Sequence, residues 1–326
     1  MKLLIVVVLL LVIAVAALLW ASTSMPGRSY RGLLAPATEA QKALAAELRR
    51  DVQALCKNGP RSVFAPASLR AAAVYIERAF RAAGYEVDEQ EYTVETVVCQ
   101  NLGVEVRGTS KADEIVLIGA HYDSVDESPG ADDNASGVAS MLALARRMRD
   151  AKPARTIRFV AFTNEEPPHF KTGQMGSYRY ARRSNERGEK IVAMLSLESM
   201  GYYQTGAKTQ RYPPPLDRLY PDTADFIAFA GNLGSGELVR RCVATVRARG
   251  NFPVEGAALP EVIQEIGWSD QWSFWQFGAK GLMVTDTALF RNPNYHRSSD
   301  TPETLDYGRM ARVVEELQPV IEELAR

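Results

Sequence analysis

The fold of this chain is decided by residues 119–137, which read GAHYDSVDESPGADDNASG. This stretch follows the apolar run IVLI at residues 115–118 and precedes a run of small and apolar residues at 138–148. The order predicts the end of a buried strand, then a loop, then the start of a helix. An imidazole at the carboxyl end of a strand and carboxylates at the head of a helix are typical of a divalent metal site in an α/β sheet. His121, one of three histidines in the chain, lies here.

Length and composition are those of a globular protein. The chain has 326 residues, of which 46% are hydrophobic, and this suffices for one large α/β domain or two small ones. Its formal net charge is -1, and charges of both signs are interspersed, so there is no basic stripe. Nucleic acid is therefore not an expected partner.

The amino-terminal segment differs from the rest of the chain. Residues 3–20 contain no charged residue, proline or glycine, and no clear A-x-A cleavage site follows them. Crossing a bilayer takes about 20 apolar residues, whereas a signal-peptide core has roughly 7 to 15. We therefore expect residues 1–21 to be an uncleaved inner-membrane anchor, with the remainder exported to face the periplasm or the extracellular space. A cleaved signal peptide, which would release a secreted protein, is the alternative.

The remaining chain is expected to form a linker and one domain. Residues 22–37 contain two prolines and two glycines and are typical of a linker, whereas residues 38–326 are expected to be a single domain. Residues 38–55 and 66–83 have helical periodicity. Residues 86–98 and 100–108 alternate between polar and apolar side chains, as a pair of antiparallel strands does.

From residue 115 onward, predicted strands alternate with predicted helices. The strands are expected at residues 115–118, 156–163, 191–197, 226–230 and 282–284. The helices are expected at residues 138–148, 236–249, 271–277 and 307–325, with a further helix start at 176–183. This alternation predicts a three-layer α/β fold, in which helices cover both faces of a mixed, mostly parallel sheet. A proline-rich excursion at residues 204–225 is predicted to be an insertion loop near the site.

The three cysteines leave the redox compartment open. Cys56 and Cys99 could form a disulfide in an oxidising compartment, and two separate thiols are the equal alternative. Cys242 lies in a predicted amphipathic helix and is expected to be a buried free thiol.

Further acidic and imidazole side chains follow the predicted strands. They are Glu165 and Glu166 after residues 156–163, Glu198 after residues 191–197, and His296 in the loop before the last helix. In an open α/β sheet, ligands bind outside the carboxyl ends of the strands. These side chains can therefore converge with His121 and Asp133.

Two imidazoles and three carboxylates suffice for two zinc ions if one carboxylate bridges them, and such a pair can acidify a shared water. That chemistry also needs a carboxylate that binds no metal and takes the proton from the water. Glu165 and Glu166 could divide these roles, because neighbours on an extended segment point in opposite directions.

Several of these residue types also have structural explanations. A lone histidine is more often structural than a ligand, and we keep that interpretation for His169. Asp132 and Asn134 are typical of turns and helix caps, because Asx side chains accept hydrogen bonds from free amides. The aromatic residues at 268–275 fit one face of a buried helix, so we expect them in the core.

Six segments of the chain form an ordered set, which reads HYDS, GADDNASG, NEE, LESMG, SDQWSFW and HRSSDT. Together they resemble the zinc aminopeptidases of metallopeptidase family 28, over most of the chain from about residue 40 to the end. That family also includes glutamate carboxypeptidases and, as divergent relatives, glutaminyl cyclases and non-catalytic domains similar to those of transferrin receptors. Each segment alone is a weak signal, but all six in one order are specific.

The resemblance implies a role for each matching residue. One zinc ion would be bound by His121, Asp133 and Glu198, and a second by Asp133, Glu166 and His296, so that Asp133 bridges the two. Glu165 would be the general base. Asp123, two residues after His121, would orient the imidazole of that histidine. Tyr295 resembles a tyrosine with which some members stabilise the oxyanion.

The chain departs from the family pattern at three places. Many members have Asp where this chain has Glu198, although the longer arm still offers oxygen ligands. The segment at residues 167–175 is longer than in the simplest aminopeptidases and could shape a substrate pocket. Gln271 stands where His is frequent, at a position that we do not count as a ligand.

The expected function is that of an exported, membrane-anchored, di-zinc aminopeptidase, which acts on peptides with a free amino terminus. A glutaminyl cyclase-like acyltransferase with one zinc ion and a non-catalytic binding domain of the same fold are the alternatives. Retention of all five candidate ligands argues against both. A glutamate carboxypeptidase would need a basic pocket for a terminal carboxylate; Arg211, Arg218 and Arg291 are available, but the sequence does not place them. The sequence carries no signal for the oligomeric state or the preferred amino-terminal residue.

Overall fold

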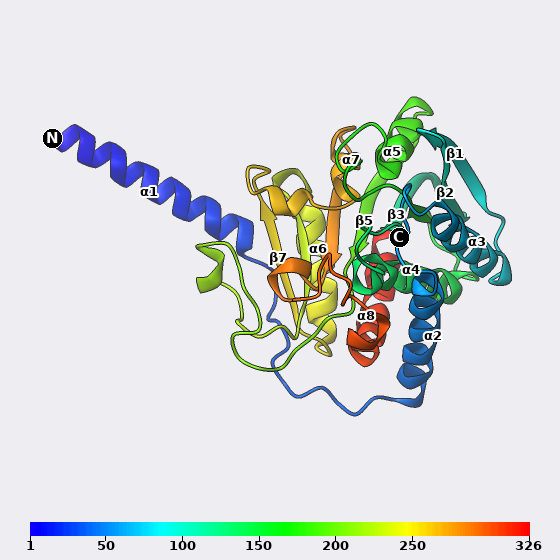
Figure 1. The fold of residues 1–326 in the computed structure, drawn as a ribbon. Coiled ribbons are helices and arrows are strands. Elements are labelled where there is room, and N and C mark those ends of the chain that lie inside the picture. Colours follow the sequence, from blue (N-terminus) through cyan, green and yellow to red (C-terminus); the bar gives the residue numbers. More distant parts are fainter.

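Eight strands form one mixed sheet in the order β1-β2-β4-β3-β5-β8-β6-β7 (Figure 1). The computed structural model describes residues 1–326, except the side chains of Val12, Ala14 and Val15. The strand bounds are β1 Asp88–Val94, β2 Val97–Val106, β3 Lys111–His121, β4 Arg155–Phe162, β5 Lys190–Glu198, β6 Ile227–Asn232, β7 Val254–Leu259 and β8 Gly281–Thr285. β3 pairs in parallel with β4 and β5, β5 with β8, and β6 with β7. The pairs β1–β2, β2–β4 and β6–β8 are antiparallel.

Helices cover both faces of the sheet, because the central strands carry apolar side chains on both sides. The helix bounds are α1 Lys2–Thr23, α2 Glu39–Cys56, α3 Pro66–Ala82, α4 Gly137–Met148, α5 Gly176–Glu186, α6 Gly236–Arg249, α7 Gln271–Trp275 and α8 Tyr307–Leu324. Val116 and Ile118 of β3 belong to the core shared with α2, α4, α6 and α8. Ile115 and Leu117 pack instead with side chains of α5 and α7. The predicted three-layer α/β fold is therefore confirmed.

Two local predictions differ from the structure. Strand β7 was not predicted, because its sequence VEGAAL has few of the β-branched and aromatic residues that favour strands. Pairing with β6 places it at the edge of the sheet. The expectation that the aromatic residues at 268–275 all lie in the core is wrong, because only Phe274 is buried and the three tryptophans are partly exposed.

The first helix of the domain begins where the sequence indicates. The Thr38 hydroxyl accepts a hydrogen bond from the Gln41 amide at 3.2 Å, and the Gln41 side chain accepts one from the Thr38 amide at 3.1 Å. This capping box satisfies amides that have no partner inside the helix. It fixes the start of α2, which packs against α4 and α8.

One part of the sheet is covered by loops on one face. Helix α6 packs against β6 and β7 on the face that carries Val254. On the other face, Leu259 of β7 forms a small apolar cluster with Leu216 and Ile266. Leu216 belongs to the excursion at residues 204–225, and Ile266 belongs to the loop after β7. These two loops enclose a cavity that is described with the site below.

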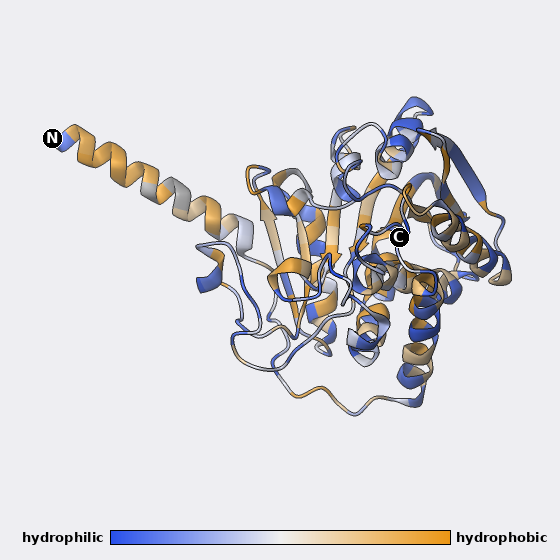
Figure 2. Ribbon diagram, in the orientation of Figure 1, coloured by the Kyte–Doolittle hydropathy of each residue, from blue (hydrophilic) through white to orange (hydrophobic). Residues whose placement is uncertain are grey.

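The amino-terminal helix α1 extends away from the domain (Figure 1), and most of it, the residues drawn in grey aside, is hydrophobic (Figure 2). It is long and apolar enough to cross a membrane, a property that signal sequences share. Residues 24–37 then follow the surface of the domain. Arg240 donates a hydrogen bond to the carbonyl of Ala21 at 2.7 Å, and Arg247 donates one to the carbonyl of Met25 at 3.2 Å.

All three cysteines are buried free thiols. The prediction for Cys242 is therefore confirmed, and the possible disulfide between Cys56 and Cys99 is not formed. Cys56 Sγ lies 3.9 Å from Nη1 of Arg61, and Cys99 Sγ lies 3.2 Å from Nδ2 of Asn164. Burial raises the pKa of Cys56 to about 11, which keeps this side chain in the unreactive thiol form at neutral pH.

Candidate metal centre

Six of the side chains singled out above lie together at one edge of the sheet. His121 ends β3, Glu198 ends β5, Glu165 and Glu166 follow β4, Asp133 lies in the turn Ala131–Ser136 before α4, and His296 lies in the loop before α8. Parallel strands end at the same edge of a sheet, and this brings together residues that are distant in sequence. All six are buried except His296, whose side chain is 33% exposed.

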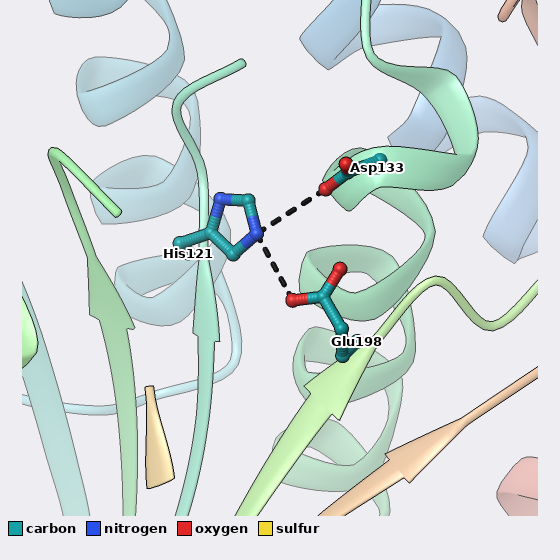
Figure 3. Close-up of side chains that lie close together, drawn as sticks. All are labelled: His121, Asp133 and Glu198. Carbon is teal, nitrogen blue, oxygen red and sulfur yellow. Dashed lines mark hydrogen bonds and ion pairs between the residues drawn. The ribbon is translucent and has the colours of Figure 1, made fainter. Parts of the chain in front are cut away.

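The first group of side chains surrounds the Nε2 atom of His121. This atom lies 3.0 Å from Oε2 of Glu198 and 3.3 Å from Oδ1 of Asp133 (Figure 3). One nitrogen and two oxygens from these residues all lie within 4.8 Å of one another. The three atoms therefore face a common point.

The second group shares Asp133 with the first. Nε2 of His296 lies 3.0 Å from Oδ2 of Asp133 and 3.3 Å from Oε2 of Glu166. These ligand atoms also lie within 4.8 Å of one another. Because Oδ1 of Asp133 faces His121 and Oδ2 faces His296, one carboxylate contributes an oxygen to each group.

Asp123 holds both the imidazole and the paired glutamates. Its Oδ1 atom lies 3.5 Å from Nδ1 of His121. The same carboxylate accepts hydrogen bonds from the amides of Glu165 at 3.1 Å and Glu166 at 3.0 Å. The sequence indicated the contact with His121, and the structure adds that Asp123 also fixes the backbone of the two glutamates.

The carboxylate of Glu198 is fixed by hydroxyl and amide groups. Its Oε2 atom accepts hydrogen bonds from Ser269 Oγ at 2.7 Å and from Asn134 Nδ2 at 3.4 Å. Its Oε1 atom accepts one from Ser199 Oγ at 3.1 Å. The glutamate at this position therefore reaches His121 in a defined orientation. Ser269 was not singled out by the sequence, although it opens the segment SDQWSFW.

Asp300 and Asp132 stabilise the turn that carries Asp133. The Asp300 carboxylate accepts hydrogen bonds from the amides of Asp132 at 2.9 Å and Asp133 at 3.2 Å. Asp132 accepts one from the Gly201 amide at 2.8 Å, so its carboxylate points away from both groups. The sequence indicated a structural role for Asp132 and no role for Asp300, whose position in the segment HRSSDT was the available signal.

Burial and crowding of like charges perturb the carboxyl groups of the site. Burial raises the pKa of Glu166 to about 7, and the charge of Asp133 acts in the same direction. Burial also disfavours the charged form of Asp133, but hydrogen bonds from His121 and His296 outweigh it and hold the pKa of Asp133 below its usual range. Burial lowers the pKa of His296, but the carboxylates of Asp133 and Glu166 outweigh this effect and raise it to about 11. The site thus concentrates negative charge that a cation would balance.

The residues present fit a zinc site. Imidazole nitrogen and carboxylate oxygen are common zinc ligands, and each group offers one imidazole and two carboxylates. The Oε1 atom of Glu166 is buried and has no hydrogen-bond partner among the described residues. A buried carboxylate oxygen in that state is stabilised by a cation.

Glu165 lies beside both groups and belongs to neither. Its Oε2 atom is 3.9 Å from Nε2 of His121, and the residue is 6% exposed. Burial raises the pKa of Glu165 well above its usual value, and the charges of Glu166, Glu198 and Asp270 add to this effect. Asp270 is fully buried, and burial raises its pKa to about 7.

Tyr295 stacks on the imidazole of His296, with ring centroids 3.9 Å apart and planes inclined by 16°. Burial, together with the charge of Asp133, raises the pKa of Tyr295 well above its usual value, so the phenol keeps its proton. The side chain also lines the cavity next to the site.

A cavity of ≈ 420 Å³ opens beside the two groups. Asp133, Glu165, Glu166, Glu198 and His296 line its polar end. The rest of the wall is mainly apolar and includes Tyr212, Leu216, Phe229, Ile263, Met283 and Phe290. Tyr212 and Leu216 belong to the excursion at residues 204–225, so that loop lies next to the site, as predicted.

Comparison with known proteins identifies the class. Residues 101–320 match peptidase family M28. The chain therefore belongs to peptidase family M28 and is a zinc-dependent peptidase, for which peptides are the substrate class.

Individual relatives and solved structures are similar to most of the chain. The protein YfbL of Escherichia coli strain K12 is 38% identical over 266 residues, which are 78% of this chain and 80% of the relative. A zinc aminopeptidase from Bacillus subtilis has a TM-score of 0.71 at 15% identity, and the match covers 86% of this chain and 95% of that one. A glutaminyl cyclase from Porphyromonas gingivalis has a TM-score of 0.63 at 19% identity, covering 86% and 98%. At such identities, the two structural similarities establish the fold alone.

Proposed function

We propose that the protein is a di-zinc aminopeptidase. His121, Asp133 and Glu198 would hold one zinc ion, and Asp133, Glu166 and His296 the other. The observation that carries this proposal is the orientation of Asp133, whose two oxygens lie 3.3 Å and 3.0 Å from the Nε2 atoms of the two histidines. When bound, two zinc ions would polarise the scissile carbonyl and lower the pKa of a water molecule.

Glu165 would be the general base. Its carboxylate is not needed in either ligand group, so it is free to accept a proton from the attacking water and to pass it to the leaving amine. Its raised pKa suits a group that must both take and release a proton. Asp123 would act as a positioning residue, since it accepts a hydrogen bond from the Glu165 amide.

The free amino terminus of the substrate would be bound by carboxylates. Glu165 and Glu198 line the same end of the cavity and could accept hydrogen bonds from an α-ammonium group. Tyr295 lines this end as well, and a phenol that keeps its proton could donate a hydrogen bond to the developing oxyanion. These three contacts would position the first peptide bond for attack.

The apolar part of the cavity would take the side chain of the amino-terminal residue. Its volume of ≈ 420 Å³ is within the range of small-molecule pockets and suits a bulky apolar group. We therefore propose a preference for leucine, methionine or phenylalanine over alanine or glycine at the first position.

The site would work outside the cytoplasm. Helix α1 is apolar, and none of its candidate membrane-spanning window is buried against the domain, so we propose that it anchors the enzyme in a membrane and that the domain is exported.

Metal content and cleavage of amino-acid anilides by the full-length chain in detergent test the proposal together. We expect two zinc ions per chain, and cleavage of leucine anilide but not of the same anilide with a blocked amino group. One zinc ion per chain without anilide cleavage would favour a glutaminyl cyclase, which cyclisation of an amino-terminal glutamine would then detect. Absence of bound metal and of both activities would favour a non-catalytic binding domain.

A further inference from the structure

The segment that joins α1 to the domain lies against one wall of the substrate cavity. We call residues 25–31 the linker strap. The strap follows β7, the edge strand of the sheet, where the amide of Val254 donates a hydrogen bond to Ser29 Oγ at 3.0 Å. Arg247 donates hydrogen bonds to the carbonyls of Met25 and Pro26, both at 3.2 Å. An exposed sheet edge needs such a cover, so the strap is held as part of the domain.

The strap contacts the cavity through Glu255. This residue of β7 lines the apolar part of the cavity, yet it is only 7% exposed. Its Oε1 atom lies 3.0 Å from Nη2 of Arg31 in the strap, and its Oε2 atom lies 3.1 Å from Nη2 of Arg247. Glu255 is therefore a carboxylate in a mainly apolar wall, paired on both oxygens with arginines behind it.

The three charges do not cancel. One carboxylate faces two guanidinium groups, so this cluster of three side chains carries a net positive charge when all are ionised, and of the three only Glu255 lines the cavity. Arg247 has a side chain that is 9% exposed and is held by several carbonyls, whereas the Arg31 side chain is 61% exposed. Arg31 is thus the member of the cluster whose loss disturbs the fold least.

We propose that Arg31 is a selectivity residue, through which the linker strap excludes cationic amino-terminal side chains from the cavity. This inference rests on the proposed aminopeptidase function and adds the substrate class: peptides that begin with an uncharged, bulky residue, and not with lysine or arginine. With Arg31 present, the two arginines more than offset the charge of Glu255, so this carboxylate does not attract a cationic side chain. Without it, the pair of Glu255 and Arg247 is neutral, and with an acidic residue at position 31 the cluster around Glu255 becomes net negative.

A binding measurement tests this without turnover. Calorimetry on the zinc-loaded, full-length chain in detergent would compare hexylamine with 1,6-diaminohexane, which differ by one ammonium group at the far end of the same chain. We expect the affinity ratio of the diamine to the monoamine to rise about two- to fivefold in Arg31→Ala and by a similar further step in Arg31→Glu. Arg31→Lys, which keeps the charge, should restore the wild-type ratio.

The exposed Arg28 of the same strap provides the matched control, and Arg28→Glu should leave the ratio unchanged. In turnover, the kcat/KM of arginine anilide relative to leucine anilide should rise in the same order of Arg31 variants. An affinity ratio that is equal in wild type, Arg31→Ala and Arg31→Glu would overturn the inference, as would an equal response to Arg28→Glu. Failure of the wild-type enzyme to cleave any anilide would overturn the aminopeptidase proposal and leave the calorimetric comparison intact.

Discussion

The two halves of the sheet differ in what covers them. Strands β3 and β5 end in buried charged groups, and apolar side chains on both faces of β3 pack against helices. Strands β6 and β7 have a face covered by α6 and a second face enclosed by loops, where the cavity lies, and α7 packs against β8 beside it. The first half holds its polar groups through hydrogen bonds from neighbouring strands and turns. The second half offers apolar surface that is shaped by loops, and its Glu255 is paired with Arg31 of the linker strap.

This difference suggests a division of labour. Groups that must keep their geometry during a reaction are best carried by rigid elements with supporting hydrogen bonds. Side-chain selectivity depends on the shape and charge of a wall, which loops can vary without disturbing the sheet. We therefore expect substitutions in the first half to change kcat for all substrates, and substitutions in the second half to change the ranking of substrates.

The largest effect is expected at Glu165. Glu165→Gln keeps the size of the side chain but removes the proton acceptor, so kcat should fall about 10³-fold for every substrate. Zinc content should stay at the wild-type value, because Glu165 is in neither ligand group. The exposed Glu127 gives a matched control, and Glu127→Gln should retain full activity. Normal turnover by Glu165→Gln would remove this residue from the mechanism.

A smaller effect is expected at Asp123, which touches the site only through other residues. Asp123→Asn weakens the hydrogen bonds that this side chain accepts from the amides of Glu165 and Glu166. It also weakens the contact with His121. Zinc affinity or kcat should fall about 10- to 100-fold, equally for leucine and alanine anilides. Competition with a zinc chelator measures the zinc affinity, and steady-state kinetics measure kcat. A change confined to one substrate would contradict the assignment of this half to chemistry.

In the second half, filling the cavity should change selectivity. Ala257 of β7 is partly buried and lines the apolar wall. Ala257→Phe should lower kcat/KM for leucine and phenylalanine anilides about tenfold, because the new ring occupies the space of the substrate side chain. Alanine anilide should be cleaved within about twofold of the wild-type rate, since its side chain needs little of that space. Ala207→Phe, at an exposed position, is the control. An equal loss of kcat/KM for all three substrates would show that this wall affects the reaction itself and not the selectivity, which would contradict the proposed difference between the two halves.

The smallest effect is expected from the cap of α2, which supports the first half from a distance. Thr38→Ala removes the hydroxyl of the capping box and should lower the free energy of unfolding by about 1 kcal/mol. The midpoint of urea unfolding should shift accordingly, and kcat/KM should be unchanged. Thr205→Ala, at an exposed loop position, should shift neither. A loss of activity in Thr38→Ala would show that the geometry of the site depends on α2.

The sequence was informative where the signal is local. The strand before His121 is predicted by its continuous apolar run, and the groups at strand ends follow because parallel strands end at one edge. The proline-rich excursion at residues 204–225 was also placed near the site from composition alone. Such inferences need only neighbouring residues and a general rule about sheets.

The remaining features depend on contacts between distant segments, for which no local pattern exists. Asp300 accepts a hydrogen bond from the amide of Asp132, which lies 168 residues earlier in the chain. Arg31 donates one to Glu255, which lies 224 residues later. Strand β7 has little intrinsic preference for its conformation and exists as a strand because β6 pairs with it. The sequence by itself therefore determined the alternation of strands and helices apart from β7, and the residues suited to bind metal. Only the tertiary structure decided the shape of the cavity and the pairing of Glu255 in its wall with Arg31 of the linker, because these arise when remote side chains are packed into one volume.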